Sequence, residues 1–113
     1  MNEFVKKKVS DEKIKNSKNK KALKEGYDFI GRDLTNANLI GANFAGALLI
    51  ASNMQDTNLK GANLIGADLR DADIRRANLE DSMFLTQSQV NTARGNSRTK
   101  LPKSLSMPSY LEK

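Results

Sequence analysis

The chain has 113 residues, a length that fits one domain, and a formal net charge of +6. It contains no cysteine and no histidine, which excludes disulfides, thiolate chemistry, the usual general base and the main zinc ligands. No apolar run is long enough to span a membrane and no signal segment follows Met1. We therefore expect a soluble, cytoplasmic protein with no membrane contact, metal, cofactor or small-molecule substrate.

The charge is distributed unevenly along the chain. Residues 1–26 carry a net charge of +5, residues 27–86 carry −3 and residues 87–113 carry +4. The basic pI of 9.7 therefore comes from the two ends of the chain and not from its middle. We expect three segments with these same boundaries.

The first segment, residues 1–26, is dominated by two lysine clusters. Ser10 suits the cap of a helix within residues 11–25, and Gly26 suits the position after its end. Few apolar residues lie between them, so we predict a frayed helix after a disordered tail. Such a tail stays solvated, binds phosphate groups without sequence preference, or folds back over the end of the next segment.

The second segment repeats with a period of five residues. A small residue usually lies two positions before each bulky apolar residue, and Asn or Asp lies between them, as in Ala37-Asn38-Leu39. A period of five fits neither a helix nor a strand, whereas a fixed repeat is typical of a solenoid. The bulky residues of this predicted core ladder are Phe29, Leu34, Leu39, Phe44, Leu49, Met54, Leu59, Leu64, Leu69, Ile74, Leu79 and Phe84.

These repeats resemble those of bacterial pentapeptide-repeat proteins. The resemblance is carried by Ala-Asn-Leu-Ile-Gly at 37–41 and 62–66, Ala-Asn-Phe-Ala-Gly at 42–46 and Ala-Asp-Leu-Arg-Asp at 67–71. It implies an all-β fold, a right-handed quadrilateral parallel β-helix with four repeats per coil and about three coils. It also implies that the bulky and the small residue of each repeat point inward.

Two features of this predicted solenoid concern its faces. Arg32 takes the place of a small residue, as Tyr27 does, so we expect an irregular start with Arg32 turned toward the open end. The outward Asn residues are expected to hydrogen-bond the turns and the neighbouring coils, with Asn38, Asn58 and Asn78 in one stack.

An exposed apolar strip is predicted where two sides of the solenoid meet. Such a strip needs a cover or a partner. Either one of the chain's own tails lies on it, or it is an interface for self-association or for another protein. The candidate interface residues are Ile30, Leu48, Ile50 and Ile65.

The third segment, residues 87–113, begins with a capping signal. Thr86 and Gln89 form the pattern of a capping box, flanked by Leu85 and Val90 as a hydrophobic staple. We predict a short helix over 87–94 that covers the last coil, shields Phe84 and stops at Gly95.

The residues after this helix are expected to form an extended tail because of two prolines. Its apolar residues are expected to pin it along the solenoid, and its basic residues to form a solvated face rather than a phosphate site. The apolar set is Leu101, Leu105, Met107, Tyr110 and Leu111, and the basic set is Arg94, Arg98, Lys100 and Lys103.

No catalytic constellation is present in the sequence, so we predict that the protein is not an enzyme. The favoured hypothesis is a non-catalytic structural or protein-interaction module, a rigid scaffold that binds an unidentified protein or itself. One alternative is a DNA mimic that binds or protects DNA gyrase, as some members of the resembled family do, but the predicted solenoid carries only −3. A further alternative is non-specific association with nucleic acid through the basic ends.

Overall fold

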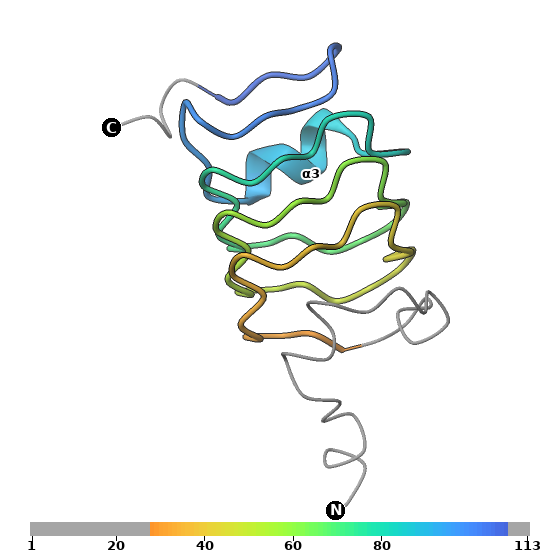
Figure 1. Ribbon diagram of the computed structural model, residues 1–113, viewed down its shortest axis with the longest axis vertical. Helices are drawn as coiled ribbons and strands as arrows, with labels where there is room; N and C mark the ends of the chain where they lie inside the picture. The colour runs from red at the N-terminus through yellow and green to blue at the C-terminus, as the bar shows by residue number, and fades with distance from the viewer. Residues whose placement is uncertain (1–27, 109–113) are drawn as a thin grey trace, which may run out of the picture.

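The computed structural model describes residues 28–108, which wind into stacked coils (Figure 1). Parallel β-bridges join residues of neighbouring coils in a register of 20, as in Asp28 with Leu48, so four five-residue repeats complete each coil. The bridges align in four columns, in chain order Asp28, Leu48 and Asp68; Asp33, Asn53 and Asp73; Asn38, Asn58 and Asn78; Asn43, Asn63 and Met83. The described repeats are therefore a β-solenoid.

The backbone forms isolated bridges instead of long strands because every repeat ends in a turn. The amide of Ala42 donates to the carbonyl of Leu39 at 3.0 Å, and Gly41 between them has a φ of +69°. A positive φ at this position is what a type II turn requires. The same corner position has a positive φ in later repeats even without glycine, as at Ala51 (+57°) and Arg76 (+61°).

The interior of the solenoid is filled by alternating large and small side chains. Eleven of the twelve bulky residues of the predicted ladder, from Phe29 to Leu79, are at most 2% exposed. The small residues two positions before them are buried as well, from Ala37 to Ser82. In the first coil the rings of Phe29 and Phe44 meet edge to face, with centroids 5.5 Å apart. This arrangement fills a narrow interior without overpacking it.

Phe84 is the exception, and its predicted place in the core ladder is wrong. Its side chain is 61% exposed. Its backbone has a φ of +60°, which earlier central residues of the ladder do not have. The chain leaves the solenoid here to enter the helix, and the left-handed conformation turns the side chain outward. The predicted shielding of Phe84 by the helix is therefore also wrong.

Helix α3, Gln87–Thr92, follows at once and takes the place that a fourth strand of the first column would occupy. The predicted capping box is present: the Thr86 hydroxyl accepts from the Gln89 amide, and the Gln89 side chain accepts from the Thr86 amide. Val90 is fully buried. The helix is shorter than the predicted 87–94, because it already ends in an extended cap at Ala93.

The tail beyond α3 adds to the end of the solenoid rather than lying along its side. Arg94 forms a bridge with Asp73 and Lys100 forms one with Asn78, so the second and third columns gain a fourth member. Leu101 and Met107 pack against the core, whereas Tyr110 and Leu111 lie outside the described residues.

Gly95 does not stop the helix as predicted. Instead, its missing side chain leaves room for a neighbouring residue. It lies buried beyond the cap, without a positive φ. A Cβ atom at this position would collide with the Met107 methyl group, lie 2.7 Å from its sulfur and 3.1 Å from the Thr99 hydroxyl. The glycine therefore lets the Met107 side chain cover the end of the solenoid interior.

The start of the described solenoid is regular. The amide of Arg32 donates to Phe29 and its carbonyl accepts from Asn53 at 2.9 Å, the same pattern as in later repeats. The predicted irregularity is therefore absent from the backbone at Arg32, whose side chain is half-buried. Tyr27, the segment 1–26 and its predicted helix lie outside the described residues. Within residues 28–108, no helix reaches the length and apolarity that crossing a bilayer requires.

Candidate interaction surface

The outward Asn and Asp residues stabilise the turns of their own repeats. In ten repeats the Oδ1 atom of this residue accepts a hydrogen bond from the backbone amide two positions later. The expected bonds of the Asn side chains to the turns are present, whereas their expected bonds to neighbouring coils are absent from residues 28–108. The acceptors are Asp28, Asp33, Asn38, Asn43, Asn53, Asn58, Asn63, Asp68, Asp73 and Asn78. Leu48 and Met83 occupy the same position without a side-chain acceptor.

Most basic residues of the solenoid are paired with a carboxylate. Arg70 binds Asp68 at 2.8 Å and Arg75 binds Asp73 at 2.7 Å, each within its own repeat. Two further pairs join neighbouring coils: Arg76 with Asp56 at 2.9 Å and Lys60 with Asp81 at 3.3 Å. The acidic residues of these pairs therefore neutralise cations of the solenoid itself.

Three of these ion pairs lower the pKa of their carboxylates. The hydrogen bonds from Arg70 and Arg76 lower the pKa of Asp68 and of Asp56. Burial acts to raise the pKa of Asp73, but the hydrogen bonds and charge of Arg75 outweigh it and the pKa is lowered. A carboxylate with a lowered pKa is a poor proton carrier near neutral pH. Across residues 28–108, no three acidic side chains are grouped so as to hold a metal ion.

The predicted apolar strip is present in part. Ile30 is 47% exposed, Leu48 36% and Ile65 48%. Ile50 is half-buried and therefore less exposed than expected. Ile30 and Leu48 belong to repeats of the first column, and Ile65 to a repeat of the fourth. Ile65 lies in the turn from the fourth column to the first, Leu48 lies on the first column, and Ile30 lies in the turn from the first column to the second.

The exposed apolar surface continues to the end of the solenoid through two residues outside the predicted strip. Met83, in the fourth column, is 45% exposed, and Phe84 beside it is the most exposed large apolar side chain of the described residues. Phe84 was missed because it continues the five-residue period. The capping box directly after it was the one signal that the chain leaves the solenoid there. We call Ile30, Leu48, Ile65, Met83 and Phe84 the apolar surface.

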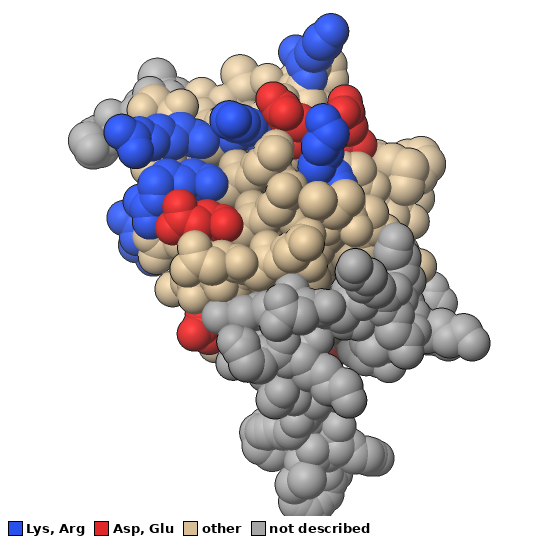
Figure 2. All heavy atoms as spheres, viewed as in Figure 1, with Lys and Arg blue, Asp and Glu red and all other residues tan. Residues whose placement is uncertain are grey.

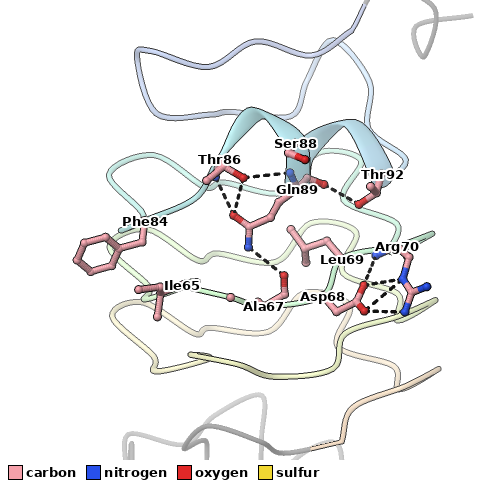
Figure 3. A pocket seen from close by; sticks show the side chains of 11 residues that line it. Ile65, Ala67, Asp68, Leu69, Arg70, Phe84, Thr86, Ser88, Gln89 and Thr92 are labelled. Atoms are coloured by element: carbon pink, nitrogen blue, oxygen red, sulfur yellow. Dashed lines mark hydrogen bonds and ion pairs between the residues drawn. The ribbon is translucent and has the colours of Figure 1, made fainter.

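A groove of about 510 Å³ opens beside this surface, between the third coil and α3 (Figure 3). Ile65 and Phe84 lie at one end of it and the Asp68–Arg70 pair at the other, and Gln89 reaches across from α3. In earlier coils the amide equivalent to that of Leu69 donates to the next coil, as Leu49 does to Asp68. The Leu69 amide finds no acceptor among residues 28–108, because α3 replaces the next strand.

Comparisons with known proteins agree with the repeat pattern. A family model described as pentapeptide repeats, in eight copies, matches residues 28–64 and 42–81. A search of curated proteins finds no match.

Two solved structures of pentapeptide repeat proteins are similar to the chain. One, from the thylakoid lumen of Arabidopsis thaliana, is 29% identical over 61% of this chain and 49% of its own, with a TM-score of 0.25. The other, from Nostoc PCC 7120, is 25% identical over 70% of this chain and 77% of its own, with a TM-score of 0.23. The chain thus spans about half the length of the Arabidopsis protein, and TM-scores this low carry no structural argument.

Proposed function

Because the chain belongs to the pentapeptide-repeat family, we propose that it is a non-catalytic protein-interaction module, a rigid solenoid that presents the apolar surface to a protein partner or to a second copy. We take the solenoid to be a right-handed, four-sided β-helix of about three coils. The 20-residue register of its bridges supports four repeats per coil.

The observation that carries this proposal is the contrast between two kinds of surface. Four of the basic residues on the solenoid are neutralised by its own carboxylates. The apolar surface, by contrast, leaves five large side chains between 36% and 61% exposed on the neighbouring fourth and first sides of the solenoid and their turns. Exposing such side chains together is costly unless a partner covers them.

Rigidity supports the same proposal. The side chains of the apolar surface project from backbone held by interlocked hydrogen bonds, such as Leu49 to Asp68 at 2.9 Å and Met83 to Ala62 at 2.7 Å. A surface that is ordered before binding loses little conformational entropy when a partner covers it. The gyrase-mimic alternative has less support, because it requires a strongly acidic surface and at least four of the eight acidic residues between residues 28 and 86 are neutralised by ion pairs.

The test compares a double variant of the apolar surface with a matched control. Leu48→Lys with Ile65→Lys places two charges on the surface, and Ile40→Lys places one on an equally exposed isoleucine of the third column. We expect the double variant to stay folded. If the wild type self-associates, the variant should lose the larger mass measured by light scattering; if it binds another protein, the variant should no longer retain that protein from a native extract. The Ile40 variant should keep both. If the double variant behaves like the wild type in both assays, the proposal is wrong.

A further inference from the structure

A second surface, on the opposite edge of the solenoid, is basic. Its residues gather where the second and third columns end, and Lys and Arg side chains crowd the upper left of the molecule in Figure 2. We call Arg75, Arg76, Arg94, Arg98 and Lys100 the basic edge. It is separated from the apolar surface, whose residues lie on the fourth and first columns and in the turns that follow them.

Hydrogen bonds and bridges bring these five residues together from distant parts of the chain. Arg94 stacks on Asp73, the partner of Arg75, through a β-bridge. The Oδ1 atom of Asn96 accepts from the amides of both Arg76, at 3.3 Å, and Arg98, at 3.0 Å. Tail residues and third-coil residues therefore lie together on one edge, with the carboxylates of Asp56 and Asp73 among the cations.

Within this edge, three cations form no ion pair with the described residues, although the charge of one of them, Arg94, helps to lower the pKa of Asp73. Arg75 and Arg76 are bound by Asp73 and Asp56. The exposed side chains of Arg94, Arg98 and Lys100 have no ion pair among residues 28–108. This differs from the rest of the described solenoid, where a carboxylate accompanies Lys60 and Arg70.

The backbone holds these three cations in fixed positions. The Arg94 amide donates to Ala72 at 2.8 Å and its carbonyl accepts from Ile74 at 2.8 Å. Lys100 is held in the same way, between Ala77 at 2.9 Å and Leu79 at 2.7 Å. Cations on a backbone fixed by hydrogen bonds bind an anionic partner at a smaller entropic cost than cations on a flexible tail.

We propose that the basic edge binds an acidic segment of a protein partner, with Arg94, Arg98 and Lys100 pairing its carboxylates. The planar guanidinium group pairs a carboxylate through two parallel hydrogen bonds, as Arg70 and Arg76 already do within this molecule. The partner class deepens the proposed interaction function, but the edge is a separate surface from the apolar one.

Two observations favour an acidic protein segment over nucleic acid. The carboxylates of Asp56 and Asp73 lie among the cations and repel a closely spaced row of phosphates. The edge also contains no aromatic side chain on which a base could stack. Separated carboxylates on a flexible segment can align with the three unpaired cations and avoid the two internal acids.

The experiment measures fluorescence anisotropy of a labelled glutamate-rich peptide and, in parallel, of a labelled DNA duplex, with the full-length chain at low salt. The test variant is Arg98→Gln with Lys100→Gln. The matched control is Lys60→Gln with Arg70→Gln, which removes the same amount of charge from cations that are already paired. Urea unfolding confirms that each variant is folded.

We expect the peptide Kd to rise about tenfold in the test variant and less than about twofold in the control. Equal weakening in both variants, or an unchanged affinity in the test variant, places binding elsewhere and overturns the proposal. Tighter binding of the duplex than of the peptide, lost in the test variant, overturns it in favour of nucleic acid. The Leu48→Lys, Ile65→Lys variant should bind the peptide like the wild type, so that failure of the proposed function and failure of this inference are distinguishable.

Discussion

The side-chain amide of Gln89 donates a hydrogen bond to the carbonyl oxygen of Ala67 at 2.9 Å and thereby joins α3 to the third coil. It also donates to Leu64 at 2.9 Å. In earlier coils the equivalent carbonyl, that of Ala47, accepts from the backbone of the next coil. One side chain therefore replaces a missing strand and closes part of the solenoid edge.

Gln89→Glu separates the two roles of this residue. Glutamate keeps the oxygen that accepts from the Thr86 amide in the capping box, but it cannot donate to Ala67 and Leu64. We expect a loss of about 1–3 kcal/mol in the free energy of unfolding, because the Ala67 carbonyl loses its donor, the Leu64 carbonyl keeps only the Ala67 amide, and both face a carboxylate. Thr86→Ala, which removes the cap alone, should cost about 1 kcal/mol in urea unfolding. Wild-type stability of the glutamate variant would show that the bonds to the coil are unimportant.

Two glycine substitutions test two different constraints. Gly61 has a φ of +71° and open space where a Cβ atom would lie, so Gly61→Ala adds only the cost of a left-handed backbone, about 1–2 kcal/mol. Gly95→Ala instead brings its Cβ against Met107. Its cost should fall when Met107→Ala is combined with it, whereas the cost of Gly61→Ala should be independent of Met107. A double-mutant cycle in urea checks both, and additive effects at Gly95 and Met107 would contradict the contact.

Asp73→Asn tests the charge of a carboxylate while keeping its turn. The pKa of Asp73 is lowered in the folded chain, so the unfolded chain binds more protons between the two pKa values. The ionised Asp73 side chain therefore contributes fully to the free energy of unfolding above the ordinary pKa of about 3.9. This contribution is lost as the pH falls through the lower pKa of the folded chain. Asparagine still accepts the bond from the Arg75 amide, as Asn53 does for Gln55 in the same column.

We therefore expect the stability difference between wild type and Asp73→Asn to shrink as the pH falls below about 5. At neutral pH the difference should stay below about 1 kcal/mol, because the Arg75 side chain is 45% exposed. Urea unfolding over this range measures both. A difference that is constant with pH would contradict the assignment.

Ser82→Ala should stabilise the protein. The Ser82 hydroxyl is buried and finds no hydrogen-bond partner within residues 28–108. Alanine, which occupies this position in most repeats, removes the unpaired hydroxyl and should add about 1 kcal/mol. Ser52→Ala is the control, because the Ser52 hydroxyl donates to Leu49 at 2.8 Å and its loss should not stabilise. Equal effects of the two substitutions would show that the Ser82 hydroxyl is satisfied in solution.

Phe84 and Leu79 occupy the same position of consecutive repeats but should respond differently to truncation. Leu79→Ala empties a site that is 1% exposed and should cost about 2–5 kcal/mol. Phe84→Ala removes an exposed ring and should change stability by less than about 1 kcal/mol. Comparable losses in thermal or urea unfolding would mean that Phe84 is buried after all.

The five-residue period indicated a solenoid, and the resemblance to pentapeptide repeats implied its four sides and its inward bulky and small residues, which pack in alternation in the narrow interior. The same local logic gave the capping box of Thr86 and Gln89, which involves residues three positions apart. The sequence pattern also pointed to the exposed side chains of Ile30, Leu48 and Ile65, because outward positions follow directly from the period.

Only the tertiary structure decided what happens where the chain leaves the repeat. Phe84 continues the period but turns outward, Gly95 makes room for Met107, and Gln89 closes the edge beneath α3. Arg94 and Lys100 become a further level of two columns only because α3 brings the tail back over the third coil. These contacts depend on segments without a repeat, and a periodic pattern holds no information about how such segments pack together.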